Sequence, residues 1–255
     1  MKSFLAVFSI ILFVLSCNLK NKKINTSENN LIQIDTIKPE ENLNKAITKV
    51  FVLGKFEYRV DTTFTKVNSE HSAKTLYLKK EVYSAFLDML NAAKQDGIVL
   101  KILSGTRNYK EQKAIWERKW NMYNNLKPLE RAQKILEYSS MPSSSRHHWG
   151  TDLDLNSLSN SYFSSGNGKT VYDWLNANAN DFGFYQVYTQ KDSGRTGYNL
   201  EKWHWSYLPL ASKYLEFYND NITYKDINGF IGSELAIDLN IIEDYVNGIS
   251  NKAKE

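Results

Sequence analysis

Residues 145–154 read SRHHWGTDLD. This stretch contains two of the four histidines, together with a glycine and two aspartates. A second segment, EKWHW at 201–205, carries His204 and Glu201. Histidine nitrogens and a carboxylate are the usual protein ligands of a catalytic zinc ion, which also keeps one position open for water. We therefore expect the two segments to fold together around one metal ion.

The local geometry lets the two segments converge. His147 and Asp154 are seven positions apart, an odd number, so a straight strand would point them to opposite faces. Gly150 lies between them and allows a bend, which places His147 in a loop and Asp154 in a strand. Alternation along the second segment sends His204 to one face and its tryptophan neighbours to the other. Glu201, three residues earlier, is close enough to reach a metal-bound water without being a ligand.

The motifs resemble those of the VanY-type D-alanyl-D-alanine carboxypeptidases. The pattern Ser-x-His-x-x-Gly-x-x-x-Asp at 145–154 is similar to the family pattern, as are Glu-x-Trp-His at 201–204 and SGTR at 104–107. This family belongs to the wider lysostaphin, D-Ala-D-Ala metallopeptidase and hedgehog fold group. The resemblance covers about 53–209. Three motifs in the right order form a specific signal, although each alone would be weak.

The resemblance implies a zinc site with assigned roles. His147, Asp154 and His204 match the zinc ligands, and Glu201 matches the general base. Zinc lowers the pKa of a bound water towards about 7, so that hydroxide is available near neutral pH. A glutamate can then take the proton and pass it to the leaving amine.

Other matching positions concern the substrate, and two positions depart from the family pattern. Arg107 matches the arginine that steadies negative charge on the scissile carbonyl, and Ser145 and Gln112 match positions that line the substrate site. Thr106 stands where the family usually has Tyr. Asp152 stands where the family often has Ala, on the same strand face as the aspartate ligand. It can orient a ligand histidine from behind or compete as a ligand, and both alternatives stay open.

Helices mixed irregularly with short strands predict an α+β fold of the hedgehog and D-Ala-D-Ala peptidase type, in which a small antiparallel sheet flanked by helices carries the zinc site. An apolar stripe followed by Gly97 predicts a helix over 79–96. Asn108 and Glu111 can form a capping box that begins the next helix. The remaining elements are expected as helices over 128–138, 171–182 and from Pro209, strands over 98–103, 184–188 and 203–207, and extended chain over 49–67.

The N-terminus predicts an exported lipoprotein. An apolar run from Phe4 to Leu15 is too short to span a bilayer comfortably but fits a signal-peptide core. It ends in VLSC, which resembles a lipobox with Cys17 as the lipidated residue, and Cys17 is the only cysteine. We expect a signal peptide over 1–17, a flexible tether over 18–45 and a lipid-anchored location in the cell envelope, facing the periplasm or the exterior. The alternatives are an ordinary cleaved signal and an extension that packs on the domain.

The remaining chain divides into a zinc peptidase domain over 46–222 and a C-terminal helical extension over 223–255. The extension carries an apolar stripe expected to pack on the domain, formed by Leu235, Leu239, Ile242, Val246 and Ile249. The formal net charge is +4, and no run of Lys and Arg resembles a nucleic-acid footprint. We therefore expect no nucleic-acid partner, and nothing in the sequence indicates an obligate protein partner.

The sequence predicts a zinc-dependent carboxypeptidase that removes a C-terminal D-amino acid from peptidoglycan stem peptides, with the membrane anchor holding it beside that substrate. A peptidoglycan endopeptidase and a non-catalytic zinc-stabilised binding module are the alternatives. Glu201 and Arg107 argue against a pure binding module, and the lack of a His-x-His pair argues against a lysostaphin-type enzyme. His71 and His148 fall on no motif position, and we expect them to be structural. The choice between D,D- and L,D-specificity stays open.

Overall fold

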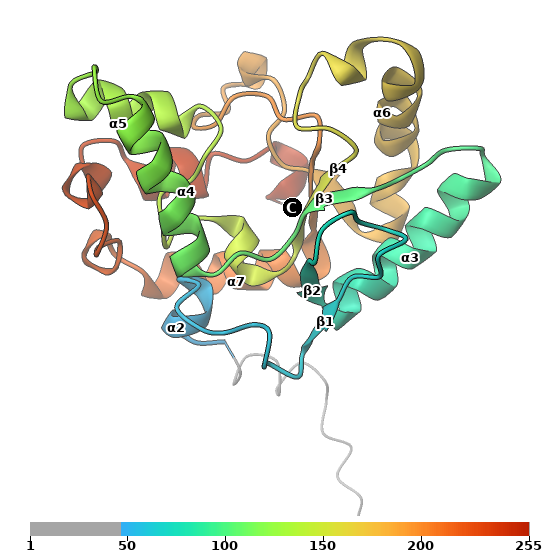
Figure 1. The fold of residues 1–255 in the computed structure, drawn as a ribbon, viewed down its shortest axis with the longest axis horizontal. Coiled ribbons are helices and arrows are strands. Elements are labelled where there is room, and N and C mark those ends of the chain that lie inside the picture. The colour runs from blue at the N-terminus through green and yellow to red at the C-terminus, as the bar shows by residue number, and fades with distance from the viewer. Residues whose placement is uncertain (1–46, 255) are drawn as a thin grey trace, which may run out of the picture. The chain divides into compact units, whose positions relative to one another are not determined.

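The computed structural model describes residues 47–254 (Figure 1). The predicted signal peptide, the predicted lipidation site at Cys17 and the predicted tether lie outside these residues. Within them, none of the helices combines the length and the apolar character that a membrane span requires.

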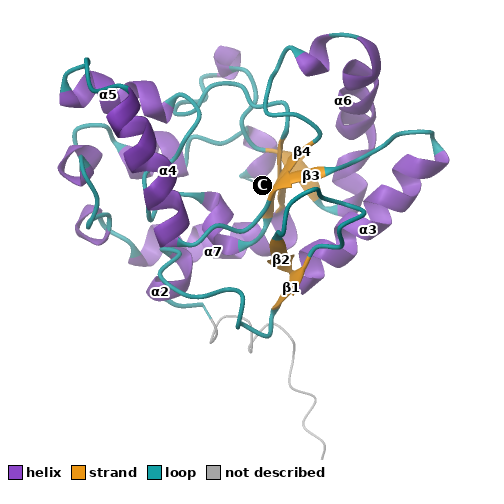
Figure 2. Cartoon of the chain, in the orientation of Figure 1, coloured by secondary structure: helices purple, strands orange, loops and turns teal. Residues whose placement is uncertain are grey.

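The central sheet has four antiparallel strands in the order β3-β4-β6-β5 (Figure 2). The strands are β3 (Ile102–Ser104), β4 (Asp152–Leu155), β6 (His204–Tyr207) and β5 (Phe184–Gln186). In the β4–β6 pair, Asp154 lies opposite His204 and Asp152 lies opposite Ser206. Directly opposed residues project from the same face of a sheet. The register alone therefore puts two carboxylates and one imidazole on one face.

A second sheet pairs β1 (Phe64–Lys66) with β2 (Tyr77–Lys79). The first part of residues 49–67 is not extended chain, contrary to the expectation from the sequence. Residues Lys49–Val52 form the short helix α2, because the Thr48 side chain accepts a hydrogen bond from the backbone N–H of Phe51 at 3.2 Å. The side chains of α2 that are buried are those of Phe51 and Val52, which are adjacent, whereas Val50 is exposed.

Five longer helices surround the sheet, and in Figure 1 strands β3 and β4 lie between α4 and α5 on one side and α3 and α6 on the other. The helices are α3 (Lys80–Gln95), α4 (Tyr109–Met122), α5 (Pro128–Leu136), α6 (Gly166–Asn178) and α7 (Leu208–Asn221). The predicted capping box is present, since Asn108 accepts from Glu111 N at 3.0 Å and Glu111 accepts from Asn108 N at 2.9 Å. The expected small antiparallel sheet flanked by helices is confirmed.

Two helical predictions differ from the structure in detail. Helix α6 begins at Gly166, five residues before the expected start at residue 171, and a 3-10 turn, Ala179–Phe182, follows it. The C-terminal residues 223–254 do not form one continuous helix. They form short 3-10 turns and a six-residue π-helix, Ile241–Val246, and the buried side chains of Ile241, Val246 and Ile249 join the core of the domain.

Candidate metal centre

A tight turn before β4 carries His147, the first of the predicted metal ligands. Arg146–Trp149 form a 3-10 turn that ends at Gly150, whose φ is +73°, and β4 begins at Asp152. This backbone region favours glycine, and a Cβ at Gly150 would lie only 2.4 Å from Cε1 of Phe64. The bend expected between His147 and Asp154 is therefore built on a glycine that no other residue replaces without strain.

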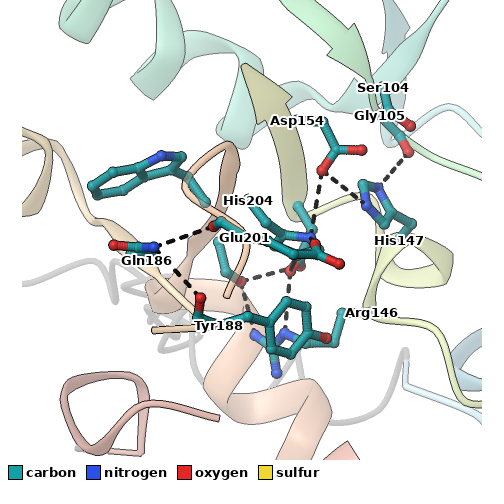
Figure 3. Close-up of polar contacts among 12 residues, drawn as sticks. Ser104, Gly105, Arg146, His147, Asp154, Gln186, Tyr188, Glu201 and His204 are labelled. Carbon is teal, nitrogen blue, oxygen red and sulfur yellow. Dashed lines mark hydrogen bonds and ion pairs between the residues drawn. The ribbon is translucent and has the colours of Figure 1, made fainter. Parts of the chain in front are cut away.

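His147, Asp154 and His204 form a buried cluster in which one donor atom of each residue lies within 4.8 Å of the others (Figure 3). Asp154 Oδ1 is 3.5 Å from His147 Nε2 and 3.4 Å from His204 Nδ1. Tetrahedral ligands at zinc distances of 2.0–2.2 Å are separated by about 3.3–3.6 Å. Asp154 Oδ1 is also buried without a hydrogen-bond donor. The three residues therefore fit a zinc ion.

Hydrogen bonds behind the cluster fix the tautomer of each histidine. His147 Nδ1 lies 2.8 Å from the carbonyl oxygen of Gly105, which only accepts, so this nitrogen carries the proton. His204 Nε2 lies 2.9 Å from Asp152 Oδ1 and is protonated for the same reason. His147 Nε2 and His204 Nδ1 consequently direct their lone pairs at the space beside Asp154, as metal ligands must.

Asp152 lies behind His204 and is fully engaged. Its Oδ1 accepts from His204 and from Arg146 Nε at 3.1 Å, and its Oδ2 accepts from Thr151 Oγ1 at 2.6 Å and Ser206 Oγ at 3.0 Å. These bonds leave no lone pair directed at the cluster. Of the two alternatives for Asp152, the geometry favours the orienting role over that of a ligand.

Glu201 lies at the edge of the cluster, with its Oε2 3.2 Å from His204 Nδ1. It does not belong to the group of three residues that could hold a metal ion. Its backbone is held on both sides, because its N–H donates to Tyr188 O at 2.9 Å and its carbonyl accepts from Gln186 Nε2 at 3.2 Å. Burial raises the pKa of the Glu201 carboxyl, against the opposing effect of His204. A carboxyl with a raised pKa is suited to accept a proton and return it near neutral pH.

The charges of the site call for an additional cation. Asp152, Asp154 and Glu201 contribute three negative charges, and Arg107 and Arg146 contribute two positive charges, which leaves one negative charge unbalanced. Burial lowers the pKa of His204, but its hydrogen bonds to Asp152 and Glu201 and the charge of Asp154 raise it to about 10. A divalent cation bound by His147, Asp154 and His204 would supply the missing positive charge.

Arg107 faces the cluster from the turn after β3. Its Nη1 is 4.0 Å from Asp154 Oδ2 and donates to Ser104 Oγ, and its Nε donates to Gln112 Oε1 at 3.0 Å. Gln112 is held in turn, because its Nε2 donates to Ser140 O at 2.8 Å. Gln112 therefore fixes the direction in which the guanidinium points, in addition to lining the site.

A groove of about 1090 Å³ opens over the cluster. It is lined by Arg107, Gln112, His147, Asp154, Glu201 and His204. This volume is at the upper end of ordinary ligand sites and admits several residues of a peptide. Ser145 is not among the lining residues, and its buried Oγ has no hydrogen-bond partner, so its substrate contact stays a prediction.

The two remaining histidines have structural partners. His148 is buried, donates from Nδ1 to Arg107 O at 2.7 Å and accepts from Ser143 N at 3.1 Å, and burial lowers its pKa to about 3. His71 lies 2.7 Å from Tyr83 Oη, away from the cluster. Sequence reasoning missed Arg146 and Tyr188, whose ring centroid is 4.7 Å from that of His204. The signal that the sequence offered for Arg146 was a charged residue directly before His147 of the metal motif.

Residues 75–210, which carry the three candidate ligands, Arg107 and Glu201, match the family model described as VanY: D-alanyl-D-alanine carboxypeptidase. This match spans more than half of the chain. The chain belongs to the VanY family. The resemblance found from the motifs is thereby confirmed.

The chain is also similar to curated relatives and to a solved structure. The chain is 30% identical over 184 residues to the putative carboxypeptidase YodJ of Bacillus subtilis, covering 69% of this chain and 63% of the relative. It is 32% identical over 128 residues to a D-alanyl-D-alanine carboxypeptidase of Enterococcus faecalis, covering 49% and 46%. The chain thus spans less than two thirds of either relative. A structure of VanYB in complex with D-alanine-D-alanine is similar with 24% identity and a TM-score of 0.49, covering 66% of this chain and 93% of that one.

Proposed function

We propose that this protein is a zinc-dependent carboxypeptidase that removes a C-terminal D-amino acid, D-Ala, from peptidoglycan stem peptides. The observation that carries the proposal is the buried cluster of His147, Asp154 and His204, with both histidine lone pairs and an unpartnered carboxylate oxygen directed at one point. Membership of the VanY family supports the substrate class.

His147, Asp154 and His204 would hold the zinc ion through Nε2, a carboxylate oxygen and Nδ1. Zinc, when bound, supplies a Lewis acid that activates water near neutral pH. Glu201 holds the proton that the attacking water loses and returns it to the leaving amine, a role that its raised pKa favours. The Glu201 carboxylate and the His204 ring beside it are both buried, which limits the contact of this carboxylate with bulk water.

Arg107 carries the charge that faces the scissile carbonyl. Its guanidinium is fixed by Gln112 and Ser104, so that little reorganisation is needed when negative charge develops on the carbonyl oxygen. Removing one such donor costs about 10²–10³ in rate. A binding module without hydrolysis would require neither this arginine nor a glutamate beside the cluster.

The test is an assay of the purified, zinc-loaded protein with defined stem tetrapeptides and pentapeptides, whose products are identified by mass. Loss of one terminal D-Ala supports the proposal, and the preferred peptide decides between D,D- and L,D-specificity. Glu201→Gln is expected to abolish turnover while it retains zinc. Glu216→Gln, an exposed residue on α7, is the matched control and retains activity. Internal cleavage would instead identify an endopeptidase, and zinc binding without any cleavage would identify a binding module.

We also propose that Cys17 is lipidated and holds the enzyme in the cell envelope, next to its substrate. The support is the apolar run that ends at a lipobox-like VLSC with the only cysteine of the chain. Fractionation of cells that express the wild type and Cys17→Ala tests this proposal. The wild type is expected in the membrane fraction, and an unchanged distribution of the variant would contradict it.

A further inference from the structure

The backbone that carries Glu201 lies in a loop and not in the sheet. Residues 189–200 form an irregular connection after β5, and β6 begins only at His204. Backbone outside a sheet ladder owes its position to other hydrogen-bond partners. His204 N supplies one of them, because it donates to the carbonyl of Glu201 at 3.3 Å. Two side-chain amides, those of Asn160 and Gln186, supply others.

Asn160 binds the residues on both sides of Glu201. Its Nδ2 donates to the carbonyl of Leu200 at 2.7 Å, and its Oδ1 accepts from the backbone N–H of Lys202 at 3.0 Å. The carboxamide thus makes the two kinds of bond that a neighbouring strand would make. Asn160 itself belongs to the loop after β4, the strand that carries Asp154. The backbone of Glu201 is thereby tied to the strand of a candidate metal ligand.

Gln186 holds the carbonyl of Glu201 from outside the groove. It lies opposite Trp205 in the register of β5 and β6, and directly opposed residues share a face, so it is on the face away from His204. Its Nε2 donates to Glu201 O at 3.2 Å and to Tyr188 O at 3.4 Å (Figure 3). Because both carbonyls only accept, the nitrogen end of the amide must face them.

The Gln186 amide is itself held by two elements that lie far away in the sequence. Tyr172 Oη, on α6, donates to Gln186 Oε1 at 2.8 Å. Ser250 Oγ donates to the backbone carbonyl of Gln186 at 2.8 Å, and Ser250 lies outside 75–210, the part of the chain that matches the family model. Gln186 is buried and is not one of the described residues that line the groove. It therefore reaches Glu201 without reaching the substrate.

We propose that Asn160 and Gln186 are positioning residues for the base, and that they hold the backbone of Glu201 so that its carboxylate stays beside the candidate metal ligands. The inference rests on the proposed function, in which Glu201 moves the proton of the attacking water. A base must lie within hydrogen-bond reach of that proton, and a displacement of about 1 Å costs about 10²-fold in rate. Because Glu201 is not one of the three candidate ligands, its displacement leaves zinc binding intact.

Gln186→Met removes the amide with little change in side-chain volume and tests the inference in the zinc-loaded full chain. It should lower kcat about 10- to 100-fold, while KM for a stem peptide and the Kd for zinc stay within about threefold. Tyr172→Phe frees one end of the amide and should lower kcat about 2- to 10-fold, as loss of one hydrogen bond implies. Gln190→Met, the same change at an exposed glutamine of the loop, is the matched control and retains kcat. A fall in zinc affinity that parallels the fall in kcat would overturn the inference, because it would mean that the whole site has loosened.

Amide hydrogen exchange, followed by NMR, separates the inference from the proposed function. The N–H groups of Glu201 and Lys202 are both hydrogen-bonded within the loop. Gln186→Met should speed exchange at Glu201, and Asn160→Ala should speed it at Lys202, each about 10-fold, while β6 keeps its wild-type rates. Wild-type exchange in both variants would overturn the inference, whatever their activity. If the wild type cleaves no stem peptide, the proposed function fails, and the exchange rates still decide whether the two amides hold this backbone.

Discussion

Asp152 accepts a hydrogen bond from His204 Nε2 at 2.9 Å and forms an ion pair with Arg146 at 3.1 Å, all three side chains being buried. Asp152 therefore selects which nitrogen of His204 faces the metal site, and Arg146 holds Asp152. Arg146 is held by Ser206 as well, and its guanidinium lies 4.9 Å from the Trp149 ring centroid. Partners of this kind orient metal-ligating histidines and raise their basicity.

The first prediction concerns this pair. Asp152→Ala is expected to weaken zinc binding about 10- to 100-fold, because His204 loses the acceptor that fixes its tautomer. It should also lower the free energy of unfolding by about 3–5 kcal/mol, because the Arg146 guanidinium is left buried and unpaired. Zinc titration against a competing chelator and urea unfolding measure the two effects.

A double variant separates them. Arg146→Met combined with Asp152→Ala removes the unpaired charge and should recover most of the stability, while zinc binding stays weak. Wild-type zinc affinity in either variant would show that Asp152 does not position His204.

The second prediction concerns the metal as a ligand of the folded state. A site held at 100 times its Kd stabilises the fold by about 2.7 kcal/mol, which for a domain of this size corresponds to about 5–10 °C in Tm. A chelator should therefore lower Tm by this amount, as measured by thermal unfolding at fixed protein concentration. His147→Ala should remove the zinc-dependent shift, and His71→Ala, at a histidine outside the cluster, should keep it. A shift that survives His147→Ala would place the metal elsewhere.

The third prediction concerns the bend before β4. Gly150→Ala places a Cβ 2.4 Å from Phe64 and a side chain at φ +73°, so the turn must shift. We expect a loss of about 1–3 kcal/mol in the free energy of unfolding and weaker zinc binding, because the turn carries His147. Gly194→Ala is a useful comparison, since it has a similar φ of +81° but no atom near the added Cβ. An equal loss at both positions would mean that φ strain alone accounts for it.

The clustering of the three candidate ligands could be predicted from the sequence because it depends on short-range rules. Strand alternation and the glycine between His147 and Asp154 already determine which side chains share a face, and the family motifs identify the partner segment. The pairing of Asp154 with His204 in the register of β4 and β6 agrees with that expectation.

The surroundings of the ligands could not be predicted in the same way. Arg146 and Asp152 lie only six positions apart, yet the network that holds them also needs Ser206, which is distant in the sequence. Helix α2 was missed because one helical turn and a short strand give similar apolar spacing, and only the Thr48 cap distinguishes them. The C-terminal π-helix has no sequence pattern of its own.

The C-terminal segment supports the wall of the metal site through Arg195. This buried guanidinium donates from Nη1 to Gly248 O at 3.1 Å and Thr196 O at 2.8 Å, and from Nε to Thr189 O at 3.1 Å. It also lies 5.8 Å from the ring centroid of Tyr188, which packs against His204. One side chain thus joins the segment beyond residue 223 to a ligand of the site.

The last prediction follows from these contacts. Arg195→Met should lower the free energy of unfolding by about 2–4 kcal/mol, because charge-assisted hydrogen bonds are worth about 1.5–3 kcal/mol and three carbonyls, of which that of Gly248 is buried, lose their donor. It should also raise KM more than it lowers kcat, since Tyr188 lines the groove without entering the proton transfer. Urea unfolding and steady-state kinetics measure both effects, with Lys191→Met, an exposed residue of the same loop, as the control. Unchanged stability and KM in Arg195→Met would show that the C-terminal segment packs on the domain without supporting its groove.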